Sequence, residues 1–173
     1  MRYVFFAVVS IINLIFMGAV FPNLNIVGIY PEIIVASIVS IAILDRSMAG
    51  AMIGLVCGLI LDLLFSSAIG IYAIPYLIVG ASMFFVRKNL RYVDRLLLPT
   101  VFAVGAAFVK EFISALIAYM MGVEFNFWNM FARVILPQAI ATGILMLLIH
   151  TIFSRIYRSS SMTLKRSDDF KHL

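Results

Sequence analysis

Long uninterrupted stretches of apolar residues are the feature that most constrains the fold of this 173-residue chain. An apolar stretch of about 18 or more residues is long enough to cross the hydrocarbon core of a bilayer as a helix. Five such stretches are plain in the sequence, at residues 3–20, 48–65, 69–86, 97–121 and 130–153. The chain is therefore predicted to be an all-α integral membrane protein.

The amino-acid composition favours the same class. Apolar residues make up 64% of the chain and charged residues 12%, against roughly 45–50% and about 25% in soluble domains. A globule of this length has too little interior to bury so many apolar side chains, so lipid must solvate them. A soluble enzyme, a disulfide scaffold and a disordered adaptor are excluded. The single cysteine, Cys57, cannot form an internal disulfide.

A sixth span is interrupted by a proline. The apolar run at 32–44 is short, and extending it back through residues 26–30 gives enough length but places Pro31 inside the segment. A proline removes a helical hydrogen bond and kinks or restarts the helix. We therefore expect a second span that is broken or partly re-entrant near Pro31.

The distribution of basic residues predicts the orientation. The connections between spans are short, so consecutive helices are expected to run antiparallel. The chain has thirteen Lys and Arg residues. If the N-terminus is cytoplasmic, Arg133 lies on the external side of the membrane and Lys110 lies within the fifth span. The cytoplasmic side receives Arg2, Arg46, Arg87, Lys88, Arg91, Arg95, Arg155, Arg158, Lys165, Arg166 and Lys171. This bias predicts six transmembrane helices with both termini in the cytoplasm.

Two regions are expected along the chain: a six-helix transmembrane domain at residues 1–153 and a basic, polar cytoplasmic tail at 154–173. The first apolar run lacks a small-x-small cleavage site before a polar start, so it is interpreted as a retained helix and not as a signal peptide. The tail is interpreted as an interface anchor that contacts anionic lipid, with docking of a cytoplasmic partner as the alternative. The net charge of +5 therefore does not indicate nucleic-acid binding.

The third span carries a stripe of glycines. Gly50, Gly54 and Gly58 are each four residues apart and share one slowly drifting helix face, which ends at Asp62. Small residues at this spacing let another backbone approach closely. The stripe is interpreted first as internal helix packing, with an intermolecular contact as the alternative.

Charged residues inside the apolar spans predict a buried polar cluster. Asp62 lies about 21 Å from the inner end of its span and Lys110 about 20 Å from the inner end of the fifth. An intramembrane charge should face the protein interior, so Asp62 and Lys110 are predicted to meet, with Glu111 a further candidate. Glu111 points about 100° away from Lys110 and need not share the contact. The cluster is interpreted as a structural ion pair, with a proton or substrate site as the alternative.

Residues at the outer ends of the spans have simpler expected roles. Glu32 and Arg133 are interpreted as interfacial charges, or as partners of one another. The aromatic residues Phe125, Phe127 and Trp128 fit an interfacial belt or an anchor for a partner's transmembrane helix. In the last span Pro137 should kink the helix, and the neighbouring Gln138 is expected to bind the backbone groups that the kink frees.

The sequence contains no recognisable catalytic or cofactor-binding pattern. His150 and His172 have no metal-ligand spacing around them, and Ser66 and Ser67 lie outside, far from His150. The glycines lack a following Gly-Lys-Ser/Thr, and too few polar residues line any helix for a pore. The expected role is therefore binding or assembly, without enzymatic activity, cofactor or metal.

An ordered set of short motifs resembles a known family. Gly28-Ile-Tyr-Pro31-Glu32 precedes the glycine stripe, which continues as Gly58-Leu-x-x-Asp62-Leu63. Gly70-Ile-Tyr-Ala-Ile-Pro75-Tyr76 and Leu136-Pro137-Gln138 follow. This order resembles MreD, the rod shape-determining membrane protein family of bacteria, with Pro31, Glu32, Asp62, Gly70 and Pro137 as its motif positions. Glutamate stands at position 32 where aspartate is commoner in the family.

The resemblance implies a component of the bacterial elongasome in the cytoplasmic membrane. It implies binding to MreC, a single-span protein, and an indirect link to MreB, RodA and a penicillin-binding protein in lateral peptidoglycan synthesis. The family is also similar in fold to the substrate-binding subunits of energy-coupling-factor vitamin transporters. A small-molecule-binding subunit is therefore the alternative function, with the polar cluster as its site. A homodimer is left open.

Overall fold

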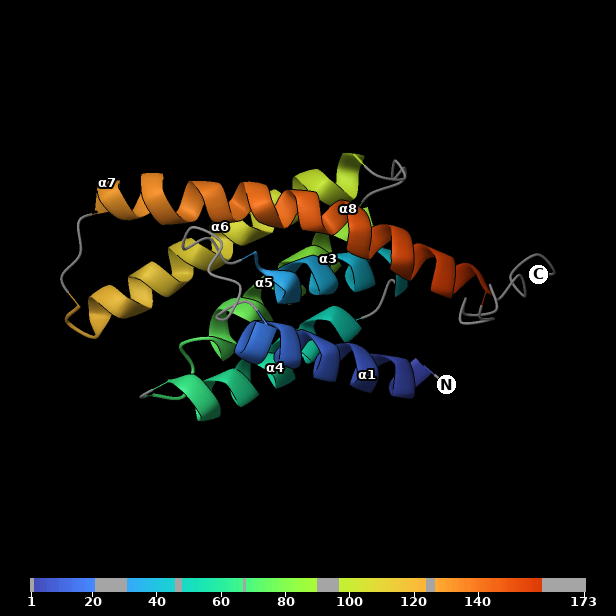
Figure 1. The fold of residues 1–173 in the computed structure, drawn as a ribbon, viewed down its shortest axis with the longest axis horizontal. Helices are drawn as coiled ribbons and strands as arrows, with labels where there is room; N and C mark the ends of the chain where they lie inside the picture. The colour runs from blue at the N-terminus through green and yellow to red at the C-terminus, as the bar shows by residue number, and fades with distance from the viewer. Residues whose placement is uncertain are drawn as a thin grey trace, which may run out of the picture.

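The computed structural model describes residues 2–20, 31–45, 48–66, 68–89, 97–123 and 127–159. In this part of the chain all regular structure is helical (Figure 1). The helices are α1 (Arg2–Ile15) with the π-turn η1 (Phe16–Val20), α3 (Ile33–Asp45), α4 (Ala49–Phe65), α5 (Ala73–Asn89), α6 (Leu97–Met120), α7 (Phe127–Met130), η2 (Phe131–Ile135) and α8 (Leu136–Ser159). The last three follow without a break and form one long helix.

Each of the predicted apolar segments contains a helix. Within the part of the chain that the structure describes, two helices are long and apolar enough to cross a membrane by themselves. These are Leu97–Met120 and Trp128–Ile156. The second span begins as a helix at Ile33, with non-helical Pro31 and Glu32 before it. Residues 21–30, on which the rest of the predicted break depends, lie outside the described part. α8 continues to Ser159, past the predicted boundary at 153, and residues 160–173 lie outside as well.

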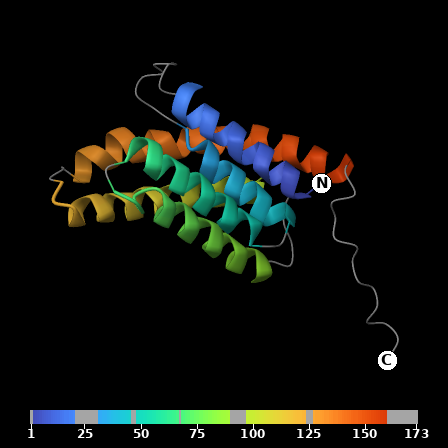
Figure 2. The same ribbon diagram turned by 90° about the horizontal axis from the view of Figure 1, so that it is seen from below.

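Helix α3 forms the centre of the bundle. Its residues alternate Ile, Val, Ala and Ser on all sides, and every position from Glu32 to Ile43 is buried. A helix that is apolar all round is buried all round. In both views α3 lies inside the bundle, and it packs against α1, α4, α5, α6 and α8 (Figures 1 and 2).

The glycine stripe of α4 packs inside the bundle. A Cβ on Gly50 would lie 2.9 Å from the carbonyl oxygen of Ile38 in α3, and one on Gly58 would lie 2.5 Å from Ala73 Cα in α5. Gly54 faces both neighbours, Ile38 and Tyr76. The stripe therefore fits two other helices of the same chain against α4, which leaves no free glycine face for a partner.

The contacts between helices fix their relative directions. Along α4, Gly54 and Gly58 contact Tyr76 and then Ala73 of α5, so these two helices are antiparallel. Gly50 and Gly54 likewise contact Ala42 and then Ile38 of α3, which is antiparallel to α4.

Two further pairs of helices are parallel. Ser10 contacts Cys57 and Gly18 contacts Phe65, a constant offset between α1 and α4. On α3 and α8, the Glu32–Thr142 and Ser40–His150 hydrogen bonds keep a constant offset too. Helix directions therefore alternate along the chain, and α1 begins at the same end of the bundle where α8 ends (Figure 1).

Candidate functional site

Glu32 is the centre of a buried polar cluster at the N-terminal end of α3. It stands between Pro31 and the first turn of α3, with 1% of its surface exposed. Its Oε1 atom accepts hydrogen bonds from Lys110 Nζ at 2.6 Å and from Gln138 Nε2 at 2.8 Å, and its Oε2 atom accepts one from the Tyr76 hydroxyl at 2.7 Å. Its backbone N–H donates to Thr142 Oγ1 at 2.9 Å. Both oxygens of this carboxylate are thus satisfied inside the protein.

Lys110 and Glu111 are neighbours on α6, and both side chains reach the cluster. Lys110 Nζ lies 2.7 Å from Glu111 Oε1, and Gln138 Nε2 donates to the same oxygen at 3.1 Å. The 100° between consecutive helix positions does not separate the two, because the long lysine stem bends back to its neighbour. Lys110 Nζ also stands over the rings of Tyr72 and Tyr76, at 6.0 and 5.7 Å from their centroids.

The charge balance of the cluster is uneven. One ammonium group meets two carboxylates, so the ionised cluster carries a formal charge of −1, and Lys110 itself is 4% exposed. Removing an ion from water costs several kcal/mol, and this cost is offset only where good hydrogen-bond geometry satisfies the remaining atoms. The amide of Gln138 and the hydroxyl of Tyr76 supply those hydrogen bonds. The cluster consequently joins α3, α5, α6 and α8 at one level of the bundle.

Asp62 does not belong to this cluster, which corrects the predicted pairing with Lys110. Its carboxylate accepts backbone hydrogen bonds from Gly70 at 2.8 Å, Tyr72 at 2.8 Å and Ala73 at 3.1 Å. The first N–H groups of a helix have no partner within the helix and attract negative charge. Ala73 is the first residue of α5, and the turn before it folds back so that the N–H groups of Gly70 and Tyr72 point at Asp62 as well. Depth along a span gives the height of a side chain, whereas its direction around the helix decides its partner.

The Asp62 contacts also position part of the cluster. Gly70 has a φ of +111° and is buried, a conformation that a residue with a side chain adopts only with strain. The turn that it makes carries Tyr72 to the ring contact with Lys110 and starts the helix that presents Tyr76. Two of the motif positions, Asp62 and Gly70, therefore support the site from outside it.

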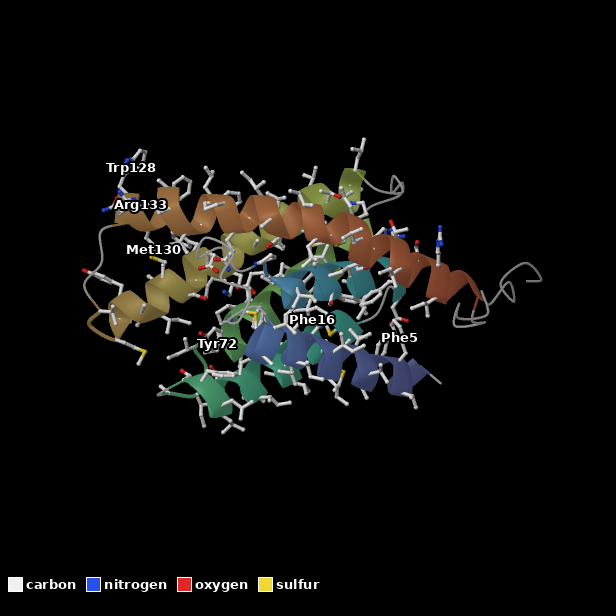
Figure 3. The ribbon with its side chains drawn as sticks, in the orientation of Figure 1. Phe5, Phe16, Tyr72, Trp128, Met130 and Arg133 are labelled. Atoms are coloured by element: carbon white, nitrogen blue, oxygen red, sulfur yellow. The ribbon has the colours of Figure 1, made fainter. Side chains whose placement is uncertain are left out.

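Glu32 and Arg133 differ in burial, because Glu32 is buried and Arg133 is exposed. The prediction that Glu32 is an interfacial charge is wrong, because it is fully buried. Arg133 is exposed on η2 and points away from the bundle together with Trp128 (Figure 3). A proline directly before an acidic residue at the head of an entirely apolar helix was the available signal for burial. Nothing in the sequence alone selects Tyr76 or Thr142 as members of the cluster.

Gln138 takes a different role from the one expected, whereas the kink at Pro137 stays a prediction. The Gln138 side chain binds the two carboxylates, and Thr142 Oγ1 donates to the Gln138 carbonyl oxygen at 2.8 Å. The π-turn η2 ends at Ile135, two residues before Pro137.

Two smaller polar contacts extend along α3 toward its far end. Ser37 Oγ donates to Asn13 Oδ1 at 3.0 Å, and Ser40 Oγ lies 3.0 Å from His150 Nδ1. All four residues are buried. Among the described residues, no group of three His, Cys, Asp or Glu side chains gathers as metal ligands.

The predicted aromatic anchor is described only in part. Trp128 is 76% exposed and stacks on Phe131 with ring centroids 6.3 Å apart. Phe131 in turn stacks on Phe108 of α6 at 6.2 Å. Phe125 and the side chain of Phe127 lie outside the described residues. Met130 points to the opposite side of the helix from Trp128, toward α6 (Figure 3).

The distribution of apolar and charged side chains over the bundle indicates the class of protein. Most residues of α6 are not buried, unlike those of the core helix of a soluble domain. Large apolar side chains face outward on several helices, while the charged residues of the site face inward. This arrangement is that of a helical integral membrane protein.

Comparison with known families identifies the family of membrane proteins to which the chain belongs. The family model described as rod shape-determining protein MreD matches residues 1–160. The chain therefore belongs to the MreD family of rod shape-determining membrane proteins. No curated protein matches it, and no solved structure matches it.

Proposed function

We propose that this protein is the MreD component of a bacterial elongasome, where it binds an MreC-like single-span protein and helps to organise lateral peptidoglycan synthesis and rod shape. MreB, RodA and a penicillin-binding protein are linked to it indirectly. The observation that carries this proposal is the family match over residues 1–160. The role is one of assembly and not of catalysis.

The proposal places the chain in the cytoplasmic membrane with six spans and both termini in the cytoplasm. The alternating helix directions support it, as does the excess of basic residues on one side. Reporter fusions at residues 46 and 124 test it, because the first position is expected to be cytoplasmic and the second external.

The outer end of α6 and the facing end of the α7–α8 helix are our candidate for the MreC contact. Phe112, Tyr119, Met120 and Trp128 are all strongly exposed there. Large exposed aromatic and sulfur-containing side chains are typical of interface anchors. The glycine stripe of α4 is no longer a candidate, because α3 and α5 cover it.

Affinity purification from native membranes in mild detergent, with mass spectrometry of the co-eluting proteins, tests the proposal. An MreC-like protein is expected to co-elute with the wild-type chain. Trp128→Ala is expected to lower its recovery about 30-fold, which corresponds to the loss of about 2 kcal/mol at an interface hot spot. Ile144→Ala is the matched control, since Ile144 is exposed on the same helix but far from the outer end.

Other co-eluting molecules would contradict the proposal. Recovery of an energy-coupling ATPase module, or of a tightly bound vitamin-like molecule, would favour the ligand-binding alternative. In the structure the polar atoms of Glu32, Lys110 and Gln138 are engaged with one another, and for that reason we assign the cluster a structural role.

A further inference from the structure

One oxygen atom of the buried polar cluster has no partner among the described residues. Glu111 Oε1 accepts hydrogen bonds from Lys110 Nζ at 2.7 Å and from Gln138 Nε2 at 3.1 Å, whereas Glu111 Oε2 accepts none in the part of the chain that the structure describes. Glu32, by contrast, uses both of its carboxylate oxygens. The Glu111 side chain is 9% exposed and that of Glu32 1%. Glu111 Oε2 is therefore the carboxylate oxygen of the cluster that can bind a further group.

A second oxygen without a partner lies on the same face of α6. Ser114 Oγ is buried and has no hydrogen-bond partner among the described residues. Ser114 follows Glu111 by three residues, and side chains at this spacing are neighbours with Cβ atoms about 5–6 Å apart. Side chains on a helix lean toward its N-terminus, which brings the Ser114 hydroxyl back toward the level of Glu111. Two unused oxygens are thus neighbours at the edge of the cluster.

The charge of the cluster indicates what these two oxygens bind. Lys110 supplies one positive charge against the carboxylates of Glu32 and Glu111, so the ionised cluster carries a formal charge of −1. A water molecule between the two unused oxygens would satisfy their hydrogen bonds but would leave this charge uncompensated. An uncompensated buried charge is strongly destabilising, so the site favours a ligand that carries one positive charge.

We propose that Glu111 Oε2 and Ser114 Oγ bind one alkali-metal cation of the size of sodium. A monovalent ion brings the formal charge of the cluster from −1 to zero, whereas a divalent ion would reverse it. Hard cations of this kind take oxygen ligands, and oxygens are what the site offers. The proposal goes beyond the assembly role and does not depend on MreC binding.

The separation of the two oxygens favours a metal ion over a proton as the source of the positive charge. Ser114 Oγ is not within hydrogen-bond distance of Glu111, so a proton on the carboxyl group does not bridge the two side chains. A sodium ion is close in size to Ca²⁺ and lies about 2.3–2.6 Å from each oxygen ligand. Such an ion can therefore lie between two oxygens that are too far apart to hydrogen-bond.

The dependence of stability on sodium tests the proposal. The purified full-length chain is unfolded in a neutral detergent, in sodium chloride or in choline chloride at the same ionic strength, and circular dichroism follows the transition. A dissociation constant of about 10 mM predicts that about 300 mM sodium lowers the unfolding equilibrium constant about 30-fold. Equal stability in the two salts would overturn the proposal. A response to pH without any response to sodium would assign the charge to a proton and overturn it as well.

Direct binding of radioactive sodium to three variants makes the test specific. The wild-type chain is expected to bind about one ion, Ser114→Ala to bind it about tenfold more weakly, and Glu111→Gln to lose it, because each variant removes one ligand. Ser82→Ala is the matched control, since the Ser82 hydroxyl donates to the Val79 carbonyl oxygen within α5. Wild-type affinity in Ser114→Ala would overturn the site. Failure here leaves the MreC proposal intact, because that protein is absent from both measurements.

Discussion

Replacing Lys110 with methionine tests the buried cluster most directly. The substitution keeps a long apolar stem but removes the ammonium group that lies 2.6 Å from Glu32 and 2.7 Å from Glu111. The two buried carboxylates then keep the amide of Gln138, which they share, and the Tyr76 hydroxyl on Glu32, but no cation. Removing one partner of a buried ion pair leaves an uncompensated charge and costs about 3–5 kcal/mol. We expect Lys110→Met to lower the free energy of unfolding by that amount.

The uneven charge of the cluster makes the companion variants informative. Glu111→Gln leaves one carboxylate for one ammonium, and its amide oxygen still accepts a hydrogen bond. Its cost is expected to stay within the about 1.5–3 kcal/mol of one charge-assisted hydrogen bond. The triple variant Glu32→Gln, Lys110→Met, Glu111→Gln contains no buried charge in the cluster and should therefore be more stable than Lys110→Met alone.

The assay is reversible unfolding by SDS in mixed micelles, followed by circular dichroism. Arg133→Met serves as the control, because it removes an exposed cation on η2 and is expected to change stability little. The reasoning fails if Lys110→Met is no more destabilising than Glu111→Gln. It fails equally if the triple variant costs the sum of its three single substitutions.

Three further predictions concern the supports of the site. Asp62→Ala should lower the free energy of unfolding by about 2–4 kcal/mol, because three backbone N–H groups lose a charged acceptor. Asp62→Asn should lower it less, and equal losses for the two variants would exclude the capping role. Gly58→Ala should destabilise the protein, because the new Cβ would meet Ala73, whereas Gly105→Ala, which has open space around it, should stabilise the protein by about 0.5–1 kcal/mol. SDS unfolding measures both changes. Stability changes of the same sign in the two variants would contradict the packing argument. Gly70→Ala should cost about 1–2 kcal/mol through its positive φ, and an unchanged unfolding curve would show that the turn relaxes freely.

The positions of the helices along the chain and their apolar surroundings follow from the amino-acid sequence. Uninterrupted apolar runs cannot be hidden in so small a globule, so their positions follow from hydropathy alone. The need of Lys110 for an acidic partner was predictable for the same reason: a charge inside an apolar span must be paired. The glycine spacing of α4 likewise required a close neighbour, whatever that neighbour was.

Which polar groups contact one another depends on how the helices pack. Asp62 and Glu32 both stand near the level of Lys110, and no local pattern says which of them faces α6. The partner is chosen by the rotation of each helix about its axis and by the turn that carries Gly70 and Tyr72 back over Asp62. The same holds for the glycine stripe, whose neighbours α3 and α5 are set by packing around the short central helix. Hydropathy determines the depth of a residue in the membrane, whereas its direction around the helix depends on contacts made by the whole bundle.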